Sequence, residues 1–276
     1  MDLKEFFEVM LCQKSEPIDE NGFIYEPKLD GSRTVFLIDK KNNYFRIQNR
    51  DSYDLTDRFP EFHNLGFLDD RIKSIVLDGE LVLNDGKRED YHNPNFKTRI
   101  HIQSKLRAKF LSKLTPLTYV VFDVVYANGD DLRNQPLFIR KKILKDFVKE
   151  TDRVKIIKFV ENDGKEFYKD ILKKGFEGMI AKKENSVYEN QRSYSWLKVK
   201  PTKKMVVSVL DYKETSGWGS FGALITPHGD VSFNSETERQ EYFRRKKLGE
   251  VKIEVRYQEM IPKSKKFRFP KFNKFI

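Results

Sequence analysis

Charged side chains recur at or beside apolar, β-rich segments, and this pattern constrains the fold more than any other feature of the chain. The segments cover residues 28–33, 77–81, 121–124, 176–182 and 196–200. A charged group next to an apolar strand costs free energy unless it is paired or bound to a ligand. A strand also has a rigid backbone that can aim such a group. Acidic and basic groups together in several of these places predict a pocket that holds an anion and a metal.

Lys28 lies in the first segment, within the sequence Glu-Pro-Lys-Leu-Asp-Gly-Ser-Arg. A lysine amine can attack a nucleotide phosphate only when it is unprotonated, and free lysine is almost entirely ammonium at neutral pH. We expect desolvation and the nearby cation Arg33 to lower the pKa of Lys28. Taken alone, the pattern also describes a surface turn with a salt bridge, because Asp-Gly is a common turn dipeptide.

The composition predicts a globular chain with a very polar surface. The 276 residues suffice for one large domain or two of ordinary size, with 38% hydrophobic and 34% charged residues. The net charge of +11 favours a polyanionic partner, although a basic soluble protein would have the same balance. The single cysteine, Cys12, cannot form an internal disulfide, which fits a reducing cytosol.

No segment has the length and apolarity of a membrane span, and the charged N-terminal residues do not resemble a signal peptide. We therefore expect a cytoplasmic protein with no membrane contact.

Hydrophobic spacing predicts the main elements of the first 200 residues. Helices are expected at 3–11, near 106–114, after Pro136 and at 165–174. Strands are expected on both sides of the Asp30-Gly31 turn, and also at 74–83, 118–126, 176–182 and 195–200.

Composition changes after Pro201, where we place the boundary between domains 1–200 and 201–276. Residues 204–276 predict short strands with glycine-rich turns and one helix at 236–248, which Ser235 and Glu238 would begin as a capping box. This order suits a small β-barrel of the oligonucleotide-binding type, the OB-fold. A small α+β appendage is the alternative.

The order and spacing of these segments resemble the covalent nucleotidyltransferases over residues 23–200, and most closely the ATP-dependent DNA ligases. Residues 24–33, 177–182 and 195–200 are similar to the compact ligases of bacteria, archaea and phages, including end-joining ligase domains. Residues 219–224 and 267–272 resemble that family's barrel more weakly. The resemblance implies an α+β fold, with a nucleotidyltransferase domain of antiparallel sheets flanked by helices and then an OB-fold barrel.

The resemblance also implies roles at the nucleotide. Lys28 would attack the α-phosphate of ATP and become a lysyl-adenylate, and Leu29 beside it would line the nucleotide site. Glu26 would accept a hydrogen bond from the adenine amino group, which could favour A over G. Phe122 would stack on the purine, with plain core packing as the alternative. Arg33 and Arg50 would bind phosphates, and a surface salt bridge is the alternative for Arg50.

The remaining implied roles concern the metal and the phosphates. Glu80 and Glu177 are oxygen ligands suited to Mg²⁺ or Mn²⁺, and Glu80 could instead hold the ribose hydroxyls. Lys198 and Lys200 alternate along a strand and share one face, so both could contact phosphate; a solvated strand face is the alternative. Lys182 could also reach phosphate. Asp30 would order Lys28 or a metal-bound water, or would only form the turn.

The implied reaction seals nicked duplex DNA in three phosphoryl transfers, in repair, end joining or replication. Basic residues would hold the DNA backbone, with a solvated charge run as the alternative for each. These candidates are Arg99, Lys105, Arg107, Lys109, Arg244, Arg245, Lys246 and Lys247. A monomer is expected, and any DNA-end-binding or repair protein that cooperates with it would be a separate chain.

One departure from the family concerns the end of the barrel, where larger ligases carry a segment rich in Arg, Asp and Lys. Here the sequence ends at Ile276, shortly after Arg268. Lys271 and Lys274 could substitute, or the first step depends less on the barrel, and the role of Arg268 stays open.

Three other functions remain compatible with the sequence. An RNA ligase and an mRNA capping guanylyltransferase share the Lys-x-Asp-Gly frame, and an inert nucleic-acid-binding relative would keep the fold. The intact set of Lys28, Glu177, Lys198 and Lys200 argues against the inert relative.

Overall fold

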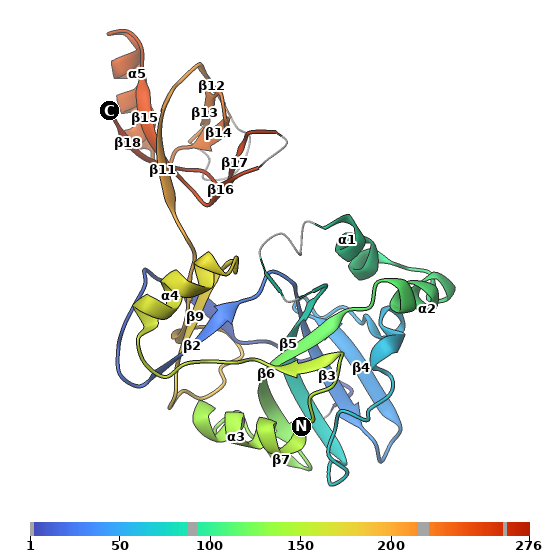
Figure 1. The fold of residues 1–276 in the computed structure, drawn as a ribbon. Helices are drawn as coiled ribbons and strands as arrows, with labels where there is room; N and C mark the ends of the chain where they lie inside the picture. Colours follow the sequence, from blue (N-terminus) through green and yellow to red (C-terminus); the bar gives the residue numbers. More distant parts are fainter. Residues whose placement is uncertain (1–2, 85, 88–92, 215–220, 262–263) are drawn as a thin grey trace. The chain divides into compact units, whose positions relative to one another are not determined.

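The computed structural model describes residues 3–84, 86–87, 93–214, 221–261 and 264–276. The chain forms two compact units, Met1–Val199 and Lys200–Ile276 (Figure 1). Each unit combines β-sheets with few helices in the described ranges, so the chain is a mixed protein of helices and mainly antiparallel strands. No helix in the described ranges combines the length and apolar character needed to cross a membrane.

The described residues of the first unit form two sheets. The smaller sheet has the order β1-β10-β9-β2, and only its β1–β10 pair is parallel. Its strands are β1 (Leu11–Lys14), β2 (Phe23–Lys28), β9 (Gly178–Lys183) and β10 (Arg192–Val199). The larger sheet has the order β4-β3-β5-β6-β7, with β8 paired in parallel to β6. Its strands are β3 (Ser32–Asp39), β4 (Tyr44–Asn49), β5 (Ser74–Val82), β6 (Thr118–Ala127), β7 (Asp130–Asp131) and β8 (Val154–Ile156).

Strands β2 and β3 flank the Asp30-Gly31 turn as expected, yet they belong to different sheets. Residues 29–31 therefore carry the chain from one sheet to the other within three residues. Gly31 permits this, because a Cβ at that position would lie 2.2 Å from the carbonyl oxygen of Leu81 on β5. In register, Lys28 lies opposite Gly178, at the end of β2 and the start of β9. The crossing thus places the Lys28 amine between the two sheets.

The larger sheet is buried on both faces. Along β3, Phe36 packs in one apolar cluster, whereas Val35 and Leu37 pack in another. The second cluster also contains Phe122 of β6 and Trp196 of β10, so it joins the two sheets. The α-helices of this unit are α1 (Pro94–His101), α2 (Lys105–Leu114), α3 (Leu137–Phe147) and α4 (Gly164–Lys173), and short 3₁₀ turns occupy Thr56–Arg58 and Pro60–Phe62.

The helix expected at 3–11 is absent. The segment is irregular up to Met10, and β1 begins at Leu11. The Gln48 side chain accepts from the N–H of Phe7 at 2.9 Å and donates to its carbonyl at 2.6 Å. The hydroxyl of Tyr188 accepts from the N–H of Met10 at 3.1 Å. These long-range hydrogen bonds take the place of helical ones, while the apolar residues still reach the core.

In the part of the second unit that the structure describes, three small antiparallel sheets surround an apolar core of their own. The sheets are β11-β15-β18, β12-β13-β14 and β16-β17, formed by β11 (Lys203–Ser208), β12 (Asp211–Lys213), β13 (Ala223–Thr226), β14 (Gly229–Ser232), β15 (Lys252–Tyr257), β16 (Glu259–Met260), β17 (Phe267–Arg268) and β18 (Lys271–Phe275). Helix α5 (Glu236–Lys246) begins where the capping box predicts, since the Ser235 hydroxyl accepts from the N–H of Glu238 at 3.2 Å. Residues 219 and 220, part of the stretch that resembles the family's barrel, lie outside the described residues.

Candidate active site

A cavity of about 380 Å³ lies between the two sheets of the first unit. That volume falls within the range of small-molecule sites. Its walls come from β1, β2, β9 and β10 of one sheet and from β3, β4, β5 and β6 of the other. Among the residues predicted from the sequence, those that line it are Glu26, Lys28, Leu29, Arg33, Arg50, Glu80, Phe122, Lys182 and Lys198. Predicted residues from six separate parts of the chain, at 26–33, 50, 80, 122, 182 and 198, therefore meet at one site.

Lys28 forms an ion pair with Glu177, which precedes β9. The Lys28 side chain is 22% exposed and that of Glu177 is 4% exposed. Burial pulls the pKa of the Lys28 amine down, but the carboxylates of Glu177, Glu80 and Asp30 outweigh burial and raise it above the ordinary lysine value. The expectation that desolvation and Arg33 lower this pKa is therefore wrong. Arg33 forms an ion pair with Asp78, and the Lys28 amine instead interacts with the three carboxylates.

Glu80 extends from β5 opposite Arg33 in the β3–β5 register. Burial raises the pKa of the Glu80 carboxyl to about 7, although the positive charges of Lys28 and Arg33 partly oppose that shift. Across the described ranges, no group of three or more His, Cys, Asp or Glu side chains could hold a metal ion. Magnesium commonly binds through one or two carboxylates together with substrate phosphates. The carboxylates of Glu80 and Glu177 beside the Lys28 amine fit a magnesium site that substrate phosphates complete. They do not fit a site in which protein side chains supply every ligand.

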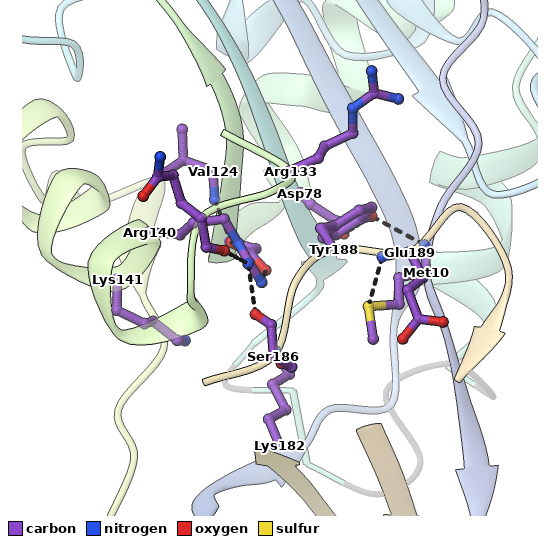
Figure 2. A network of polar contacts seen from close by, with 12 residues as sticks. Met10, Asp78, Val124, Arg133, Arg140, Lys141, Lys182, Ser186, Tyr188 and Glu189 are labelled. Carbon is purple, nitrogen blue, oxygen red and sulfur yellow. Dashed lines mark hydrogen bonds and ion pairs between the residues drawn. The ribbon is translucent and has the colours of Figure 1, made fainter. Parts of the chain in front are cut away.

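Arg33 is committed to Asp78 of β5. Its Nε and Nη2 atoms donate to the two carboxylate oxygens at 2.6 and 2.5 Å, and Nη2 also donates to the Met10 carbonyl at 3.2 Å. Tyr188 donates to the same carboxylate at 2.6 Å. In Figure 2, Tyr188 lies between Asp78 and Met10. The hydrogen bonds of Arg33 thus brace β3, β5 and the N-terminal segment, whereas the sequence suggested a phosphate ligand. Asp78, Tyr188 and Met10 were not predicted, because their contacts span long sequence separations.

Glu26 is held by two lysines. Its carboxylate is buried, with one oxygen bonded to Lys141 of α3 and the other 2.7 Å from the amine of Lys182 on β9. Burial is the main reason that the pKa of Lys141 is lowered, to about 8. The Lys182 amine also lies 4.0 Å from the Trp196 ring centroid and 4.4 Å from that of Phe122. Lys182 therefore pairs with Glu26, whereas the sequence suggested that it reaches phosphate, and Lys141 was not predicted.

Phe122 lies at the boundary between the cavity and the apolar core. It lines the cavity, yet it is only 8% exposed and belongs to the apolar cluster that joins the sheets. The Arg33 guanidinium lies 4.7 Å from its ring centroid, and Trp196 meets it edge-on at 6.3 Å. The packing leaves one part of the ring at the cavity wall.

The other predicted residues differ in position. Arg50 is exposed at the cavity wall, in the turn after β4. Asp30 is buried, and its N–H donates to the Gly86 carbonyl at 2.9 Å. Strand β10 ends at Val199, so it includes Lys198 but not Lys200. Lys198 lines the cavity, whereas Lys200 begins the second unit and is not among the lining residues.

The predicted DNA contacts also separate into groups. Arg99 is fully buried and donates to Glu61 at 2.6 Å, so its prediction as a DNA contact is wrong. Its guanidinium also donates to the carbonyls of Thr115 and Arg58. Lys105, Arg107 and Lys109 on α2 are exposed. On α5, Arg244 and Arg245 pair with Glu241, and Lys246 pairs with Asp211. Residues 88–92 of the basic region lie outside the described part of the chain.

Comparisons with known proteins identify relatives. The family model of the ATP dependent DNA ligase domain matches residues 9–200. The SPbeta prophage-derived DNA ligase-like protein LigB of Bacillus subtilis is 30% identical over 194 residues, which cover 69% of this chain and 66% of that protein. A DNA ligase of Thermoplasma volcanium is 30% identical over 215 residues, covering 70% of this chain and 35% of that enzyme. The chain thus spans less than two thirds of these curated relatives.

Solved structures share the fold at lower identity. A structure from a study of Lig E DNA ligases, described as binding DNA with a minimal scaffold, has a TM-score of 0.70 at 18% identity and covers 96% of this chain and 98% of its own. The ligase domain of LigD from M. tuberculosis has a TM-score of 0.58 at 20% identity, covering 98% of this chain and 95% of its own.

Proposed function

The chain belongs to the ATP-dependent DNA ligase family, and from that premise we propose that it seals 5′-phosphate/3′-hydroxyl nicks in duplex DNA through a lysyl-AMP intermediate on Lys28. The observation that carries this proposal is the cavity between the sheets, where the Lys28 amine lies beside the carboxylates of Glu177 and Glu80. ATP is the nucleotide that the family implies.

Each proposed step is a transfer at phosphorus. In the first, the Lys28 nitrogen bonds to the α-phosphorus of ATP, the bond to the β-phosphate oxygen breaks, and pyrophosphate leaves as the amine gives up a proton. In the second, an oxygen of the DNA 5′-phosphate attacks the same phosphorus, and Lys28 leaves with a proton regained. In the third, the 3′-hydroxyl attacks the activated 5′-phosphate, loses its proton and expels AMP.

The charges around Lys28 define what activation requires. The raised pKa of Lys28 comes from carboxylates that outweigh burial, so offsetting those carboxylates is the condition for deprotonating the amine. A Mg²⁺ or Mn²⁺ ion held by Glu80, Glu177 and phosphate oxygens would supply that positive charge. With the carboxylates offset, burial alone lowers the pKa of the amine. Lys198, which lines the cavity, and Arg50, which is exposed at the cavity wall, would bind phosphate oxygens.

The base and the DNA would use other parts of the molecule. Glu26 would accept from the adenine amino group, and Phe122 would contact the purine. We propose that the second unit is an OB-fold barrel, on the support of its small antiparallel sheets around one core. Lys105, Arg107 and Lys109 are exposed and would bind DNA phosphates. A monomer, acting in the cytoplasm alone or with a separate DNA-end-binding protein, would suffice for this chemistry.

The test is the mass of the protein after incubation with ATP and Mg²⁺ in the absence of DNA. We expect one added AMP, located on Lys28 by peptide mapping and discharged when nicked DNA is added. Lys28→Ala should form no adduct and seal no nick, whereas the matched control Lys40→Ala, at an exposed turn, should behave as the unaltered protein. An unchanged mass, or AMP on another residue, would overturn the proposal.

Substrate comparison separates the rival functions. Labelling of Lys28 by GTP in place of ATP would indicate a capping guanylyltransferase, and sealing of nicked RNA in preference to nicked DNA would indicate an RNA ligase. An inert relative would form no adduct with either nucleotide.

A further inference from the structure

The carboxylate of Glu26 is held between two cations that come from different layers of the first unit. Lys182 lies on β9, the strand paired with β2, and its amine is 2.7 Å from one Glu26 oxygen. Lys141 lies on α3, 115 residues away in sequence, and bonds to the other oxygen. The side chains of Glu26 and Lys182 are each 2% exposed, and that of Lys141 is 5% exposed. Water therefore has little access to this ionic cluster.

Helix α3 is fixed firmly enough to aim Lys141. The neighbouring residue, Arg140, donates from Nε and Nη2 to the two carboxylate oxygens of Asp123, both at 2.9 Å. Its Nη1 atom donates to the carbonyls of Gln135 and Ser186 at 2.5 and 2.9 Å. Figure 2 shows Arg140 joined to Ser186, with Lys141 as the next residue of the same helix. Arg140 and Asp123 balance each other's charge, so Lys141 and Lys182 are the cations that act on Glu26.

Lys141 does not line the cavity, whereas Glu26 and Lys182 do. Glu26 is therefore the cavity residue that Lys141 contacts directly, and the direct route from Lys141 to a bound nucleotide passes through it. Two ammonium groups in contact with a buried carboxylate favour its ionised form, because removal of either would leave the charge less compensated. An ionised carboxylate only accepts hydrogen bonds, whereas a protonated one can also donate.

This difference decides which purine the site prefers. A 6-amino purine offers an N–H donor to an ionised carboxylate, while a 6-oxo purine presents lone pairs that the carboxylate repels. A protonated or reoriented Glu26 would lose that distinction, since it could donate to the 6-oxo group. Sites built around a required hydrogen bond discriminate strongly, because the wrong ligand leaves buried polar groups unpaired.

We propose that Lys141 is a positioning residue that, together with Lys182, keeps Glu26 an ionised acceptor and so makes the nucleotide site select 6-amino over 6-oxo purines. The inference rests on the proposed function, in which Glu26 faces the purine. It adds a residue outside the cavity as a determinant of nucleotide choice.

The experiment compares ATP with ITP, whose base carries a 6-oxo group in place of the 6-amino group. The rate at which AMP or IMP is transferred covalently to the protein is measured against nucleotide concentration. The pH is 7, below the pKa of about 8 of the Lys141 amine. The quantity of interest is the ATP/ITP ratio of rate over half-saturating concentration. We expect Lys141→Met to lower this ratio at least tenfold, mainly through weaker saturation by ATP, because a hydrogen bond to a charged group contributes about 1.5–3 kcal/mol.

Three variants distinguish positioning from a merely structural effect. Lys141→Arg keeps the cation and should restore the ratio. Lys142→Met removes an exposed lysine charge at the next position of α3 and should leave the ratio unchanged. In a Glu26→Gln background, Lys141→Met should change the ratio no further, and this double variant has no uncompensated carboxylate to impair folding. Thermal unfolding of each variant verifies that it is folded.

The outcomes are separable. A Lys141→Met protein that loses ATP and ITP activity in equal proportion, or whose ratio also falls in the Glu26→Gln background, would overturn the inference while leaving the ligase proposal intact. Failure of the unaltered protein to form any ATP adduct would instead overturn the proposed function, and the inference with it.

Discussion

Replacing Arg140 by methionine should destabilise the first unit more than any change to a surface charge. Arg140 and Asp123 form a two-pronged ion pair in which both side chains are 0% exposed. Removing one partner of a buried pair leaves the other charge uncompensated and costs about 3–5 kcal/mol. Two carbonyl groups, at Gln135 and Ser186, would also lose their donor.

The cost converts into a measurable shift. For a unit of this size, 1 kcal/mol corresponds to about 2–4 °C in the unfolding midpoint, so Arg140→Met should lower that midpoint by about 10 °C. Circular dichroism melts and urea titrations would measure it. The matched control is Arg133→Met, because Arg133 pairs with Asp131 at the surface, where the two side chains are 32% and 37% exposed. Exposed pairs contribute about 0–1 kcal/mol.

A second variant tests the physical cause. If the cost comes from the stranded charge of Asp123, then combining Arg140→Met with Asp123→Asn should recover part of the lost stability, since no carboxylate remains in the core. Asparagine can still accept the hydrogen bond that Val124 donates to residue 123 at 2.9 Å. An Arg140→Met protein as stable as Arg133→Met would refute the reasoning about the buried pair.

Three further outcomes follow from the described contacts. Burial raises the pKa of Glu80 to about 7, so its contribution to stability is present below about pH 4.5 and is lost as the pH rises through 7. Urea unfolding at pH 5 and pH 8 should therefore show that Glu80→Gln gains stability relative to the unaltered protein at the higher pH. An equal difference in stability at both pH values would contradict this. Gly31→Ala would place a methyl 2.2 Å from the carbonyl oxygen of Leu81 and should slow adduct formation about tenfold or more, although Lys28 is unchanged. Intact-protein mass spectrometry would measure the rate, and an unchanged rate would contradict the close approach. DNA affinity should fall steeply with salt, and Arg107→Ala and Lys109→Ala should each reduce the slope of log affinity against log salt by about 1, so a flat response in fluorescence anisotropy would argue against phosphate contacts.

Much of the first unit could be predicted because its strands carry local signals. The apolar, β-branched stretch of β6 ends at Asn128-Gly129, and β2 and β3 flank the Asp-Gly turn, so their existence follows from short-range patterns. The same patterns place charged residues at strand ends, which is why nine predicted side chains meet in the cavity. Their chemical roles remain predictions.

The parts that could not be predicted depend on packing between distant segments. The apolar spacing at 3–11 resembles a helix, but hydrogen bonds from Gln48 and Tyr188 hold the segment in another conformation. Arg99 looks like one more charge in a basic run, and only the fold reveals its buried bond to Glu61. Lys141 appears in sequence as a polar position of α3, since nothing local indicates a partner 115 residues earlier.

The three-residue passage from β2 to β3 also limits how relatives of this protein can vary in length. One inserted residue would add up to about 3.3–3.6 Å of chain, comparable to the distance over which a nucleophile reaches its target. An insertion within β2 would turn the following side chains to the opposite face of the strand. Insertions should therefore accumulate in outer loops such as the β3–β4 turn and be excluded between Lys28 and Ser32, which makes loop length at this point a simple criterion for judging whether a distant homologue can still form the adduct.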